Sequence, residues 1–346
     1  MIFLDTTRTG AAGHRSGLTR VGTRVAAALG ARAVATRWDN TRRALAATPA
    51  VPGAGDWFLT TELFSEDERP GFTAFLEAGS CRRAAVFHDA IPLRHPHITW
   101  PRSVARHPGY MKLLARFDRV WAVSRASRDD LLGFWRWQGV TQPPPVDVLA
   151  LGADFNGAPR VTQRSTPPGV PRLLCLGILE PRKNQAFLVD VCEELWAAGL
   201  VFELHIVGRT NPHFGRPIRA GLEAVRRTRR DRLHLHAAAD DNVVAGLFAT
   251  ARATVFPTLA EGCGLPLLES LWLGVPCVCS DLPVLRENAD AGGCLPVAAS
   301  DRSAWRQAIE RIVTDSALAT RLGAEAMARP LPAWSDTADM LAAALR

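Results

Sequence analysis

The sequence lacks the features that mark membrane-spanning, exported or disulfide-linked chains. Its apolar stretches are interrupted by Arg, Asp or Pro within about 10 residues, which is too short to cross a bilayer. The first residues, Met1 to Asp5, have neither the basic start nor the long apolar run of a signal peptide. The seven cysteines are odd in number and irregularly spaced, which argues against a disulfide framework. We therefore expect a cytoplasmic protein with reduced thiols.

Motifs for dinucleotides and for metals are also missing. No Gly-x-Gly-x-x-Gly follows the first predicted strand, which disfavours a dehydrogenase. His234 and His236 lie two residues apart on one predicted strand, and Cys277 and Cys279 do so on another. Neither pair has a third ligand at a spacing typical of metal sites. We interpret both pairs as buried strand packing and expect no metal there.

The composition is that of a globular chain. With 346 residues, 47% hydrophobic and 22% charged, it fits two domains of about 150 to 180 residues. The net charge of +7 is almost all arginine, which favours a nucleotide diphosphate, an anionic membrane surface or nucleic acid as partner, although genomic composition explains it equally well. The arginines from Arg226 to Arg232 lack interleaved aromatics. We interpret them as the solvated end of a helix and expect no nucleic-acid partner.

Short apolar strands alternate with helices in both halves, which predicts parallel sheets covered on both faces. In the first half the expected strands are 2–5, 56–60, 84–88 and 120–123, and the expected helices are 18–29, 71–78 and 110–116. In the second half the expected strands are 173–177, 202–207, 233–236, 254–256 and 276–279, and the expected helices are 185–198, 217–227, 242–249 and 266–273. Ligands of such sheets bind at the carboxyl ends of the strands.

The most informative stretch runs from Phe256 to Ser270. A strand ends there, a loop with Gly262 and Gly264 follows, and a helix begins near Pro266, because proline favours the first helical turn. Backbone amides and a helix N-terminus at the carboxyl edge of a sheet form a ready site for phosphate. The glycines permit the close approach that a diphosphate needs. This loop is therefore the predicted donor site.

Two glutamates flank this loop. Glu261 precedes the amides, within reach of hydroxyls beyond the phosphates, and Glu269 lies about one turn into the helix, where a carboxylate can accept both hydroxyls of a ribose. With seven residues between them, the string resembles the hallmark of glycosyltransferase family 4. The resemblance implies that Glu261 binds the donor sugar and stabilises the transition state, and that Glu269 holds the ribose. Cys263 and Leu265 are expected to contact the donor, although most relatives have an aromatic residue in place of Cys263.

A second segment resembles the same family. Leu174 to Gln185 reads as a strand, a turn at Gly177, two adjacent cations and a helix start. Arg182 can pair with two oxygens at once, and Lys183 acts as a point charge. In the family these cations neutralise the departing diphosphate, so the resemblance implies catalysis without a metal or other cofactor. The alternative is a solvated basic turn.

The first half resembles the acceptor-binding half of the family. The loop Ser16–Gly22 resembles the Gly-rich loop that meets the donor phosphates, which implicates Gly17. The segment Phe87–Leu93 resembles the His-Asp-x-Ile-Pro segment of mannosyl- and rhamnosyl-transferring members. By this resemblance, His88 hydrogen-bonds the transferred sugar, and Asp89 orients it or contacts the acceptor. A histidine at a strand end is otherwise more often structural.

The resemblance implies an α/β fold of the GT-B type, with two Rossmann-like domains whose parallel sheets face each other across a cleft. We expect an acceptor-binding domain at 1–156, a linker at 157–171 and a nucleotide-sugar-binding domain at 172–333. Residues from about 334 to 346 should pack back on the first domain. No residue is a convincing nucleophile, so the resemblance implies retaining, front-face transfer in which the leaving phosphate takes the acceptor's proton.

The resulting hypothesis is transfer of a sugar from a nucleotide diphosphate-sugar to a glycan or lipid-linked acceptor. GDP-mannose is the best single donor, on the His88 segment alone, and other GDP-, UDP- and dTDP-sugars stay open. The segment from Phe134 to Trp137 either packs within its domain or touches a lipid-linked acceptor at the inner face of a membrane. The alternatives are a nucleotide-sugar 2-epimerase, which the paired glutamates disfavour, and a non-catalytic sugar-nucleotide-binding module.

Overall fold

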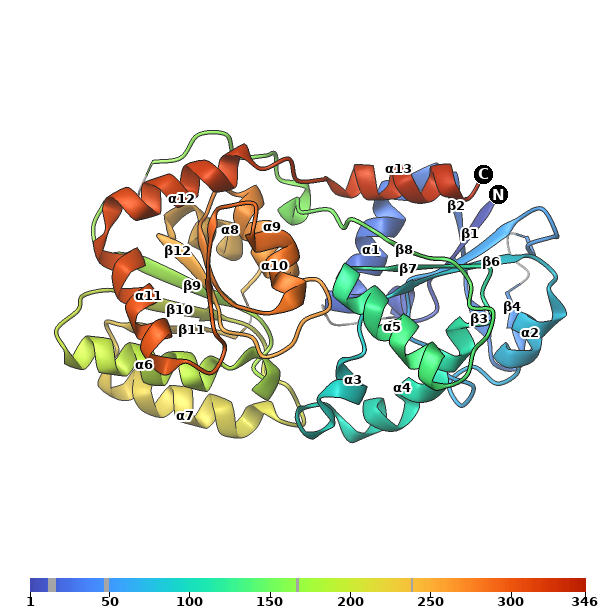
Figure 1. The fold of residues 1–346 in the computed structure, drawn as a ribbon, viewed down its shortest axis with the longest axis horizontal. Helices are drawn as coiled ribbons and strands as arrows, with labels where there is room; N and C mark the ends of the chain where they lie inside the picture. Colours follow the sequence, from blue (N-terminus) through green and yellow to red (C-terminus); the bar gives the residue numbers. More distant parts are fainter. Residues whose placement is uncertain (12–16, 47–49, 166–167, 238) are drawn as a thin grey trace. The chain divides into compact units, whose positions relative to one another are not determined.

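The chain folds into two compact units. The computed structural model describes all residues except 12–16, 47–49, 166–167 and 238. The first unit comprises Met1–Gly152 with Pro332–Arg346, and the second comprises Ala153–Leu331. Each contains a six-stranded parallel sheet with helices on both faces (Figure 1). The predicted α/β class, with two Rossmann-like domains, is confirmed.

The first unit is built on a parallel sheet and a small antiparallel pair. Its strands are β1 (Ile2–Asp5), β2 (Ala33–Thr36), β3 (Trp38–Asp39), β4 (Ala44–Leu45), β5 (Trp57–Thr60), β6 (Arg82–Phe87), β7 (Arg119–Ala122) and β8 (Val146–Val148). Its α-helices are α1 (Gly17–Leu29), α2 (Phe72–Ala78), α3 (Ile91–Arg94), α4 (Pro101–Leu114), α5 (Arg125–Trp137) and α13 (Trp334–Ala344). The sheet order is β2-β1-β5-β6-β7-β8, and β3 pairs with β4. Strands β1 and β5 are buried throughout, which explains their unbroken apolar runs.

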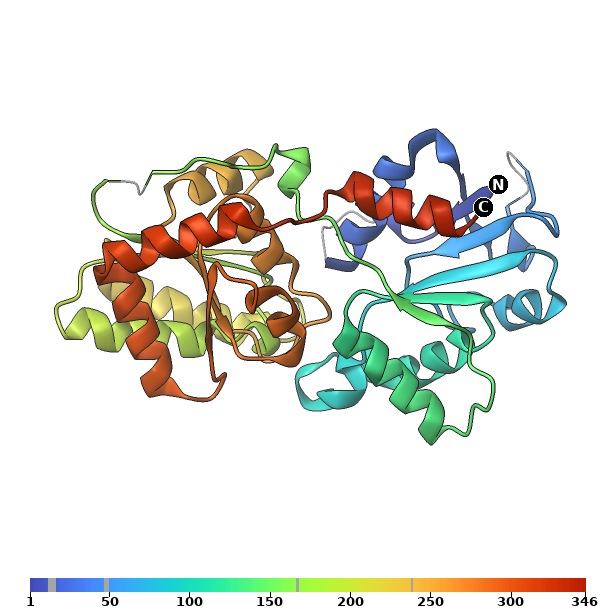
Figure 2. The same ribbon diagram turned by 45° about the horizontal axis from the view of Figure 1, so that its top comes forward.

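Helices cover both faces of this sheet (Figures 1 and 2). Helices α2, α4 and α5 pack on one face, where their apolar side chains share a core with β5, β6 and β7. Phe64 contacts Phe72 and Tyr110 in this core, with ring centroids 4.9 and 5.0 Å apart. Helices α1 and α13 lie side by side over the other face. The core therefore fixes the sheet from both sides.

The C-terminal segment that was expected to return to the first domain forms α13. The hydroxyl of Thr337 donates to the carbonyl of Ala150 at 2.8 Å. A Cβ atom at Gly152 would overlap Trp334, so only glycine permits this approach of α13 to the chain that leaves the first unit. Helix α13 is thus tied to the first unit beside Gly152, the residue after which the chain enters the second unit.

The second unit repeats the same architecture. Its strands are β9 (Arg172–Leu176), β10 (Glu203–Val207), β11 (Leu233–His236), β12 (Ala253–Phe256), β13 (Cys277–Ser280) and β14 (Cys294–Val297). Its α-helices are α6 (Gln185–Ala197), α7 (Gly215–Thr228), α8 (Asp241–Thr250), α9 (Leu265–Trp272), α10 (Pro283–Ala289), α11 (Arg302–Thr314) and α12 (Ser316–Ala328). The sheet order is β11-β10-β9-β12-β13-β14, and all its pairs are parallel.

Successive side chains of these strands enter two different cores. Leu173 and Ile206 join the core under α6, α7 and α11, whereas Leu174 and Val207 pack with Phe248 of α8 on the opposite face. This alternation follows from the strand period of two. Because helices cover both faces, most of these strands are short apolar runs in the sequence. The exceptions are β10 and β11, which carry polar side chains at alternate positions.

The segment 157–171 is not a free linker. Arg160 donates to the carbonyls of Leu271 and Ala326, at 2.7 and 2.6 Å, at the C-terminal ends of α9 and α12. Arg164 donates to the carbonyl of Phe248 at 2.9 Å near the end of α8, and burial lowers its pKa to about 10. These arginines satisfy carbonyls that helix ends leave unpaired. The described part of the segment therefore belongs to the second unit, and the boundary lies after Gly152, not after residue 156.

Three helices of the first unit differ from the sequence expectation, and the first of them, α3, was not predicted. Helix α4 starts at Pro101, where proline suits the first turn, and not at 110. It also contains Pro108, and because proline disfavours a helix interior, the sequence does not predict the first half of this helix. Helix α5 was not predicted, and it is capped by Ser124, whose hydroxyl accepts from the amide of Ser127. The segment 134–137 ends α5. Trp135 is buried and donates to a carbonyl of α4 at 2.7 Å, whereas Trp137 is 75% exposed.

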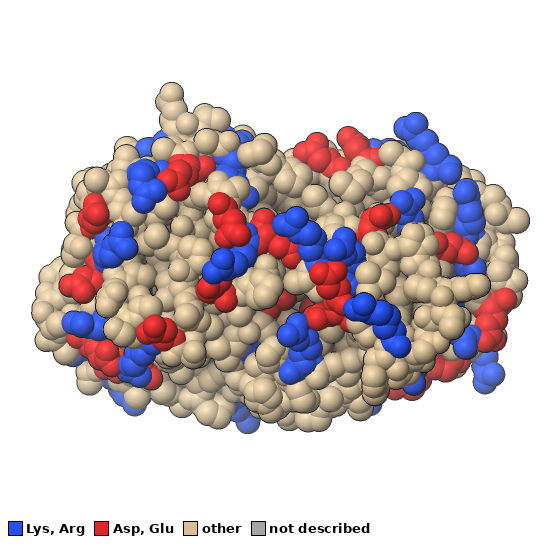
Figure 3. Space-filling view, in the orientation of Figure 1, with Lys and Arg blue, Asp and Glu red and all other residues tan. Residues whose placement is uncertain are grey.

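Positive and negative side chains are interspersed over the face drawn in Figure 3. On this face the positive charge is therefore not gathered in one patch. All seven cysteines are free thiols, and six of them are buried. Among the described residues, we find no helix with the length and apolarity needed to span a bilayer.

Candidate active site

Two loops at the carboxyl ends of neighbouring strands form the candidate site of the second unit. Strand β9 leads through a 3₁₀ turn, η5 (Pro181–Lys183), into α6, and β12 leads through the glycine-containing loop into α9. Because β9 and β12 are adjacent and parallel, both loops emerge at the same sheet edge. The amide of Leu259 donates to the carbonyl of Arg182 at 2.8 Å, which joins the loops directly.

A buried ion pair lies at the centre of this site. The Nζ atom of Lys183 donates to Oε1 of Glu261 at 2.5 Å, and Nη1 of Arg182 lies 3.1 Å from the same oxygen. The hydroxyl of Thr258 is 2.7 Å from it. Only 9% of the Lys183 side chain and 8% of the Glu261 side chain are exposed. The two adjacent cations are thus not a solvated basic turn.

The charges of this pair depend on each other. Burial alone would raise the pKa of Glu261, but the charges of Lys183 and Arg182, with hydrogen bonds from Lys183 and Thr258, outweigh it and hold that pKa below its usual range. Burial lowers the pKa of Lys183, and the charge of Glu261 opposes this only in part. Glu261 is therefore an ionised carboxylate held in place by fixed donors.

Glu180 is a site residue that the sequence reading did not single out. Its Oε1 accepts from Nη2 of Arg182 at 2.7 Å, and its Oε2 accepts from Nδ2 of Asn211 at 3.0 Å. The guanidinium is therefore held by Glu180 on one side, and it donates to the carbonyl of Ala260 at 2.9 Å on the other. Glu180 lies in the same short motif as the two cations, and this position was the sequence signal that could have identified it. Asn211 lies in the loop after β10, and no sequence signal pointed to it.

Glycines make room for this arrangement. Gly177 has a φ of 151°, and a Cβ there would lie 3.3 Å from Cδ of Lys183. A Cβ at Gly208, on the neighbouring loop, would overlap the carbonyl of Gly177. Gly264 caps α9 in the left-handed region with a φ of 81°, which favours glycine. The loops can therefore approach the β9 turn closely only because these positions lack side chains.

The remaining predicted donor residues lie along the start of α9. Gly262 and Cys263 precede the helix, and Leu265 is its first residue. Burial raises the pKa of the Cys263 thiol to about 12, with Glu287 and Glu261 adding to the effect, so this side chain is a neutral thiol. Glu269 follows within the helix and is only 5% exposed. The structure thus brings Arg182 and Lys183 to Glu261, and keeps Glu269 further along α9.

His88 and Asp89 lie in the first unit, directly after β6. The Nε2 of the buried His88 is 2.7 Å from the carbonyl of Thr61, and its own carbonyl accepts from the hydroxyl of Ser127 at 2.9 Å. Burial lowers the pKa of His88. The neutral ring donates through Nε2, which leaves Nδ1 as an acceptor for a hydroxyl. Asp89 accepts from the amide of Ile91 through Oδ1 at 2.9 Å.

A second buried histidine supports this segment. The Nε2 of His107, on α4, is 2.8 Å from the carbonyl of Asp89, and burial lowers the pKa of His107. Tyr110, one turn later, is buried, and burial followed by the charge of Asp89 raises its pKa. His107 was not predicted from the sequence, because only the tertiary packing of α4 brings it to the His-Asp segment.

The loop that leads to Gly17 is anchored by a buried ion network. Arg69 pairs with Asp5 and with Glu62, each at 2.6 Å, and all three side chains are at most 2% exposed. Glu62 also accepts from the amides of Arg8 and Thr9 at 2.8 Å. Gly17 is the first residue of α1. Of the predicted Gly-rich loop Ser16–Gly22, Ser16 lies outside the described residues, and the rest forms the first turns of α1 and not a loop.

Comparison with known families gives a match in the second unit. Residues 170–315 match the family model named "Glycosyl transferases group 1". The match lies within the second unit and covers less than half of the chain, so it shows that this unit is similar to glycosyltransferases of that group. The sequence resemblance to glycosyltransferase family 4 is thereby confirmed.

Relatives with curated descriptions are mannosyltransferases. The chain is 30% identical over 230 residues to the serotype-specific mannosyltransferase WbdA of Escherichia coli, a match that covers 60% of this chain and 28% of WbdA. It is 31% identical over 182 residues to a GDP-mannose-dependent alpha-(1-6)-phosphatidylinositol dimannoside mannosyltransferase of Mycobacterium tuberculosis, covering 52% of this chain and 46% of that protein. The chain thus spans less than half of either relative.

Solved structures agree on the fold. Anabaena HepE, crystallised in complex with UDP and glucose, aligns with a TM-score of 0.75 at 14% identity, over 99% of this chain and 98% of that one. At this identity the likeness concerns architecture alone. The most distinctive group of the candidate site in this chain is the buried carboxylate of Glu261 with its two cations.

Proposed function

We propose that the chain is a retaining mannosyltransferase that takes GDP-mannose as donor and needs no metal. The single observation that carries this proposal is the ionised Glu261 held between Lys183 and Arg182 at the carboxyl edge of the sheet. Breaking a glycosyl phosphate bond leaves a nucleotide diphosphate, whose added charge needs fixed positive groups. Lys183 and Arg182 are such groups. Glu261 then binds hydroxyls of the sugar whose bond is breaking.

The charge balance of the free site explains how it can accept a diphosphate. Two cations, Arg182 and Lys183, pair with two carboxylates, Glu180 and Glu261. The net charge of these four side chains is therefore small. The N-terminus of α9, with its bare amides, supplies further positive potential for phosphate oxygens. Arg182 can turn one edge of its guanidinium to a phosphate without leaving Glu180. Binding therefore redistributes existing hydrogen bonds and creates no unpaired buried charge.

The choice of mannose rests on two independent supports. The His88-Asp89 segment was tied to mannosyl and rhamnosyl transfer from the sequence alone, and the curated relatives in both organisms are named mannosyltransferases. The neutral His88 presents an acceptor nitrogen suited to a sugar hydroxyl. With no described side chain assigned as nucleophile, we place proton removal from the acceptor on the leaving phosphate.

The acceptor in this proposal is a glycan or a lipid-linked glycan. Exposed aromatic residues such as Trp137 at the end of α5 suit contact with the interface of a membrane, where a lipid-linked acceptor would reside. The enzyme would then act at the cytoplasmic face of that membrane. Binding to vesicles with and without a lipid-linked acceptor tests this part separately.

The proposal is tested by measuring sugar transfer and donor hydrolysis with purified protein. GDP-mannose, GDP-fucose, UDP-glucose, UDP-galactose and dTDP-rhamnose are compared in the presence of EDTA. We expect turnover with GDP-mannose that EDTA does not change. Glu261→Ala should lower kcat by roughly 10²- to 10³-fold or more, as for other groups that stabilise a transition state, with GDP binding largely retained.

A matched control is Glu310→Ala, which removes an exposed carboxylate of α11 in the same unit. It should leave turnover unchanged. Wild-type activity in Glu261→Ala would remove that residue from the chemistry. Preference for a UDP- or dTDP-sugar would replace the donor, and GDP binding without turnover on any acceptor or water would favour a non-catalytic module.

A further inference from the structure

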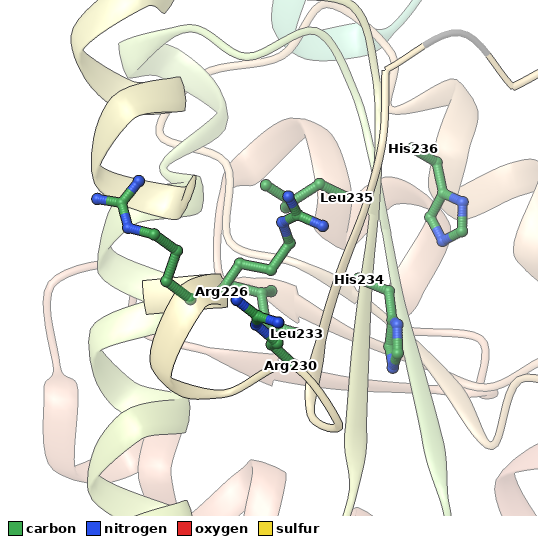
Figure 4. Close-up of a pocket in the computed structure, with 7 residues that line it drawn as sticks. Arg226, Arg230, Leu233, His234, Leu235 and His236 are labelled. Carbon is green, nitrogen blue, oxygen red and sulfur yellow. The ribbon is translucent and has the colours of Figure 1, made fainter. Parts of the chain in front are cut away.

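Histidines gather on one edge of the second sheet, away from the loops of the candidate active site. Strands β10 and β11 pair in parallel, and β11 is the edge strand, with His205 directly opposite His234. Glu203 lies two residues before His205, and His236 two residues after His234, so all four side chains share one face. Figure 4 shows His234 and His236 on the same side of β11.

The side chains of this cluster are close enough to share a ligand. One ligand atom each from Glu203, His205 and His234 lie within 4.8 Å of one another. Oε2 of Glu203 is 3.0 Å from Nε2 of His205, and Nε2 of His236 is 3.1 Å from Nδ1 of His205. Within the described residues, the solvent-shielded Nε2 of His234 has no hydrogen-bond partner. A buried polar atom without a partner calls for an explanation.

We propose that Glu203, His205 and His234 bind a divalent transition-metal ion, with Zn²⁺ as the ion of choice. Two imidazole nitrogens and one carboxylate oxygen are a donor set that zinc accepts, and three protein ligands leave a position for water. His236 supports the site by accepting from Nδ1 of His205, because a ligating histidine needs its other nitrogen held by a partner. The ion would give Nε2 of His234 its missing partner.

Two features of the cluster oppose metal binding and set its geometry. The Nε of Arg172 donates to Oε2 of Glu203 at 2.9 Å, so the metal must share this carboxylate with a cation. The second carboxylate oxygen is available to Arg172 when Oε2 turns to the metal. The rings of His205 and His234 stack with centroids 4.5 Å apart, so their lone pairs converge only after a side-chain rotation. The half-exposed His234 on an edge strand has room to rotate.

The site is separate from sugar transfer. Glu203 begins β10 and His205 is its third residue, whereas Glu261 follows the carboxyl end of β12. A metal here would hold the edge strand β11 to β10. Next to it lies a surface pocket of about 490 Å³, lined by His234, His236 and arginines such as Arg226 and Arg230 (Figure 4). These arginines suit an anion, so the test must distinguish the two ligands.

The full chain, stripped with EDTA and dialysed, is titrated with Zn²⁺ and with Co²⁺, and binding is followed by calorimetry, by the thermal midpoint and by the visible absorption of Co²⁺. We expect one ion per chain, a raised midpoint and cobalt bands of low-coordinate N/O ligation. His234→Ala and Glu203→Gln should each lower the affinity at least 10-fold. His236→Gln should lower it by about 10- to 100-fold while keeping one ion per chain, as expected for an orienting partner.

The matched control is His213→Ala, which removes an exposed histidine of the same unit outside the cluster and should bind as the wild type does. Circular dichroism establishes whether each variant is folded. If His234→Ala is not folded, the Glu203→Gln variant provides the test. Absence of stoichiometric Zn²⁺ binding to the wild type would overturn the proposal, as would wild-type affinity in both ligand variants. Stabilisation by inorganic phosphate but not by Zn²⁺ would show that the arginines of the pocket bind an anion there, and it would also overturn the metal proposal.

Discussion

Replacing Lys183 by methionine removes the buried cation beside Glu261 but keeps most of the length of the side chain. Removal of one partner from a buried ion pair costs about 3–5 kcal/mol when the other charge is left alone. Here Arg182 at 3.1 Å and Thr258 at 2.7 Å remain on the same oxygen. We therefore expect a smaller loss of about 2 kcal/mol in the free energy of unfolding, or a thermal midpoint lowered by about 4–8 °C for a unit of this size.

The pH dependence of this loss has a definite sign. The folded-state pKa of Glu261 lies below its reference value of 4.5, so the stability that the ionised carboxylate contributes is present above pH 4.5 and is lost as the pH falls through the lowered pKa. The difference in midpoint between wild type and Lys183→Met should therefore be largest near pH 7 and shrink toward pH 4. In the variant, the pKa of Glu261 should rise, because the largest influence that lowers it is gone.

The assay is calorimetry of wild type, Lys183→Met, Glu261→Gln and the double variant at both pH values. Coupling between the two sites should be about 1.5 kcal/mol at pH 7. Additivity of the two substitutions within about 0.5 kcal/mol would refute the reasoning, because residues that share a buried hydrogen bond cannot be independent. Lys112→Met, at the exposed Lys112 of α4, is the matched control and should leave the midpoint unchanged.

Two further predictions concern the first unit. Arg69→Met leaves Asp5 and Glu62 buried without their cation. Calorimetry should therefore show that the unfolding free energy of this unit is lower by about 3–5 kcal/mol. A loss below about 1 kcal/mol would show that the network is not a buried ion triad. His88→Ala removes the ring that donates to the carbonyl of Thr61 and offers Nδ1 to a sugar. It should therefore lower kcat by roughly 10²-fold and leave GDP binding unchanged. Loss of GDP binding alone would contradict this role.

The sequence reading succeeded where structure depends on neighbouring residues. The strand expected at 233–236 is β11, and the helix expected at 185–198 matches α6 to within one residue. It failed where a local rule was overridden, as in α4, where the internal Pro108 hides a helix that packing stabilises. It also read 157–171 as a linker from composition, although Arg160 and Arg164 bind the ends of three helices.

The sequence by itself determined the alternation of strands and helices and the glycine loop before α9. These features are local, because strand period, helix caps and loop chemistry are set by residues a few positions apart. Only the tertiary structure decided that Lys183 pairs with Glu261, and that Glu203 and His205 meet His234. In a parallel sheet each neighbour arrives after a helical crossover, so its partners are far away in sequence and no spacing reveals them.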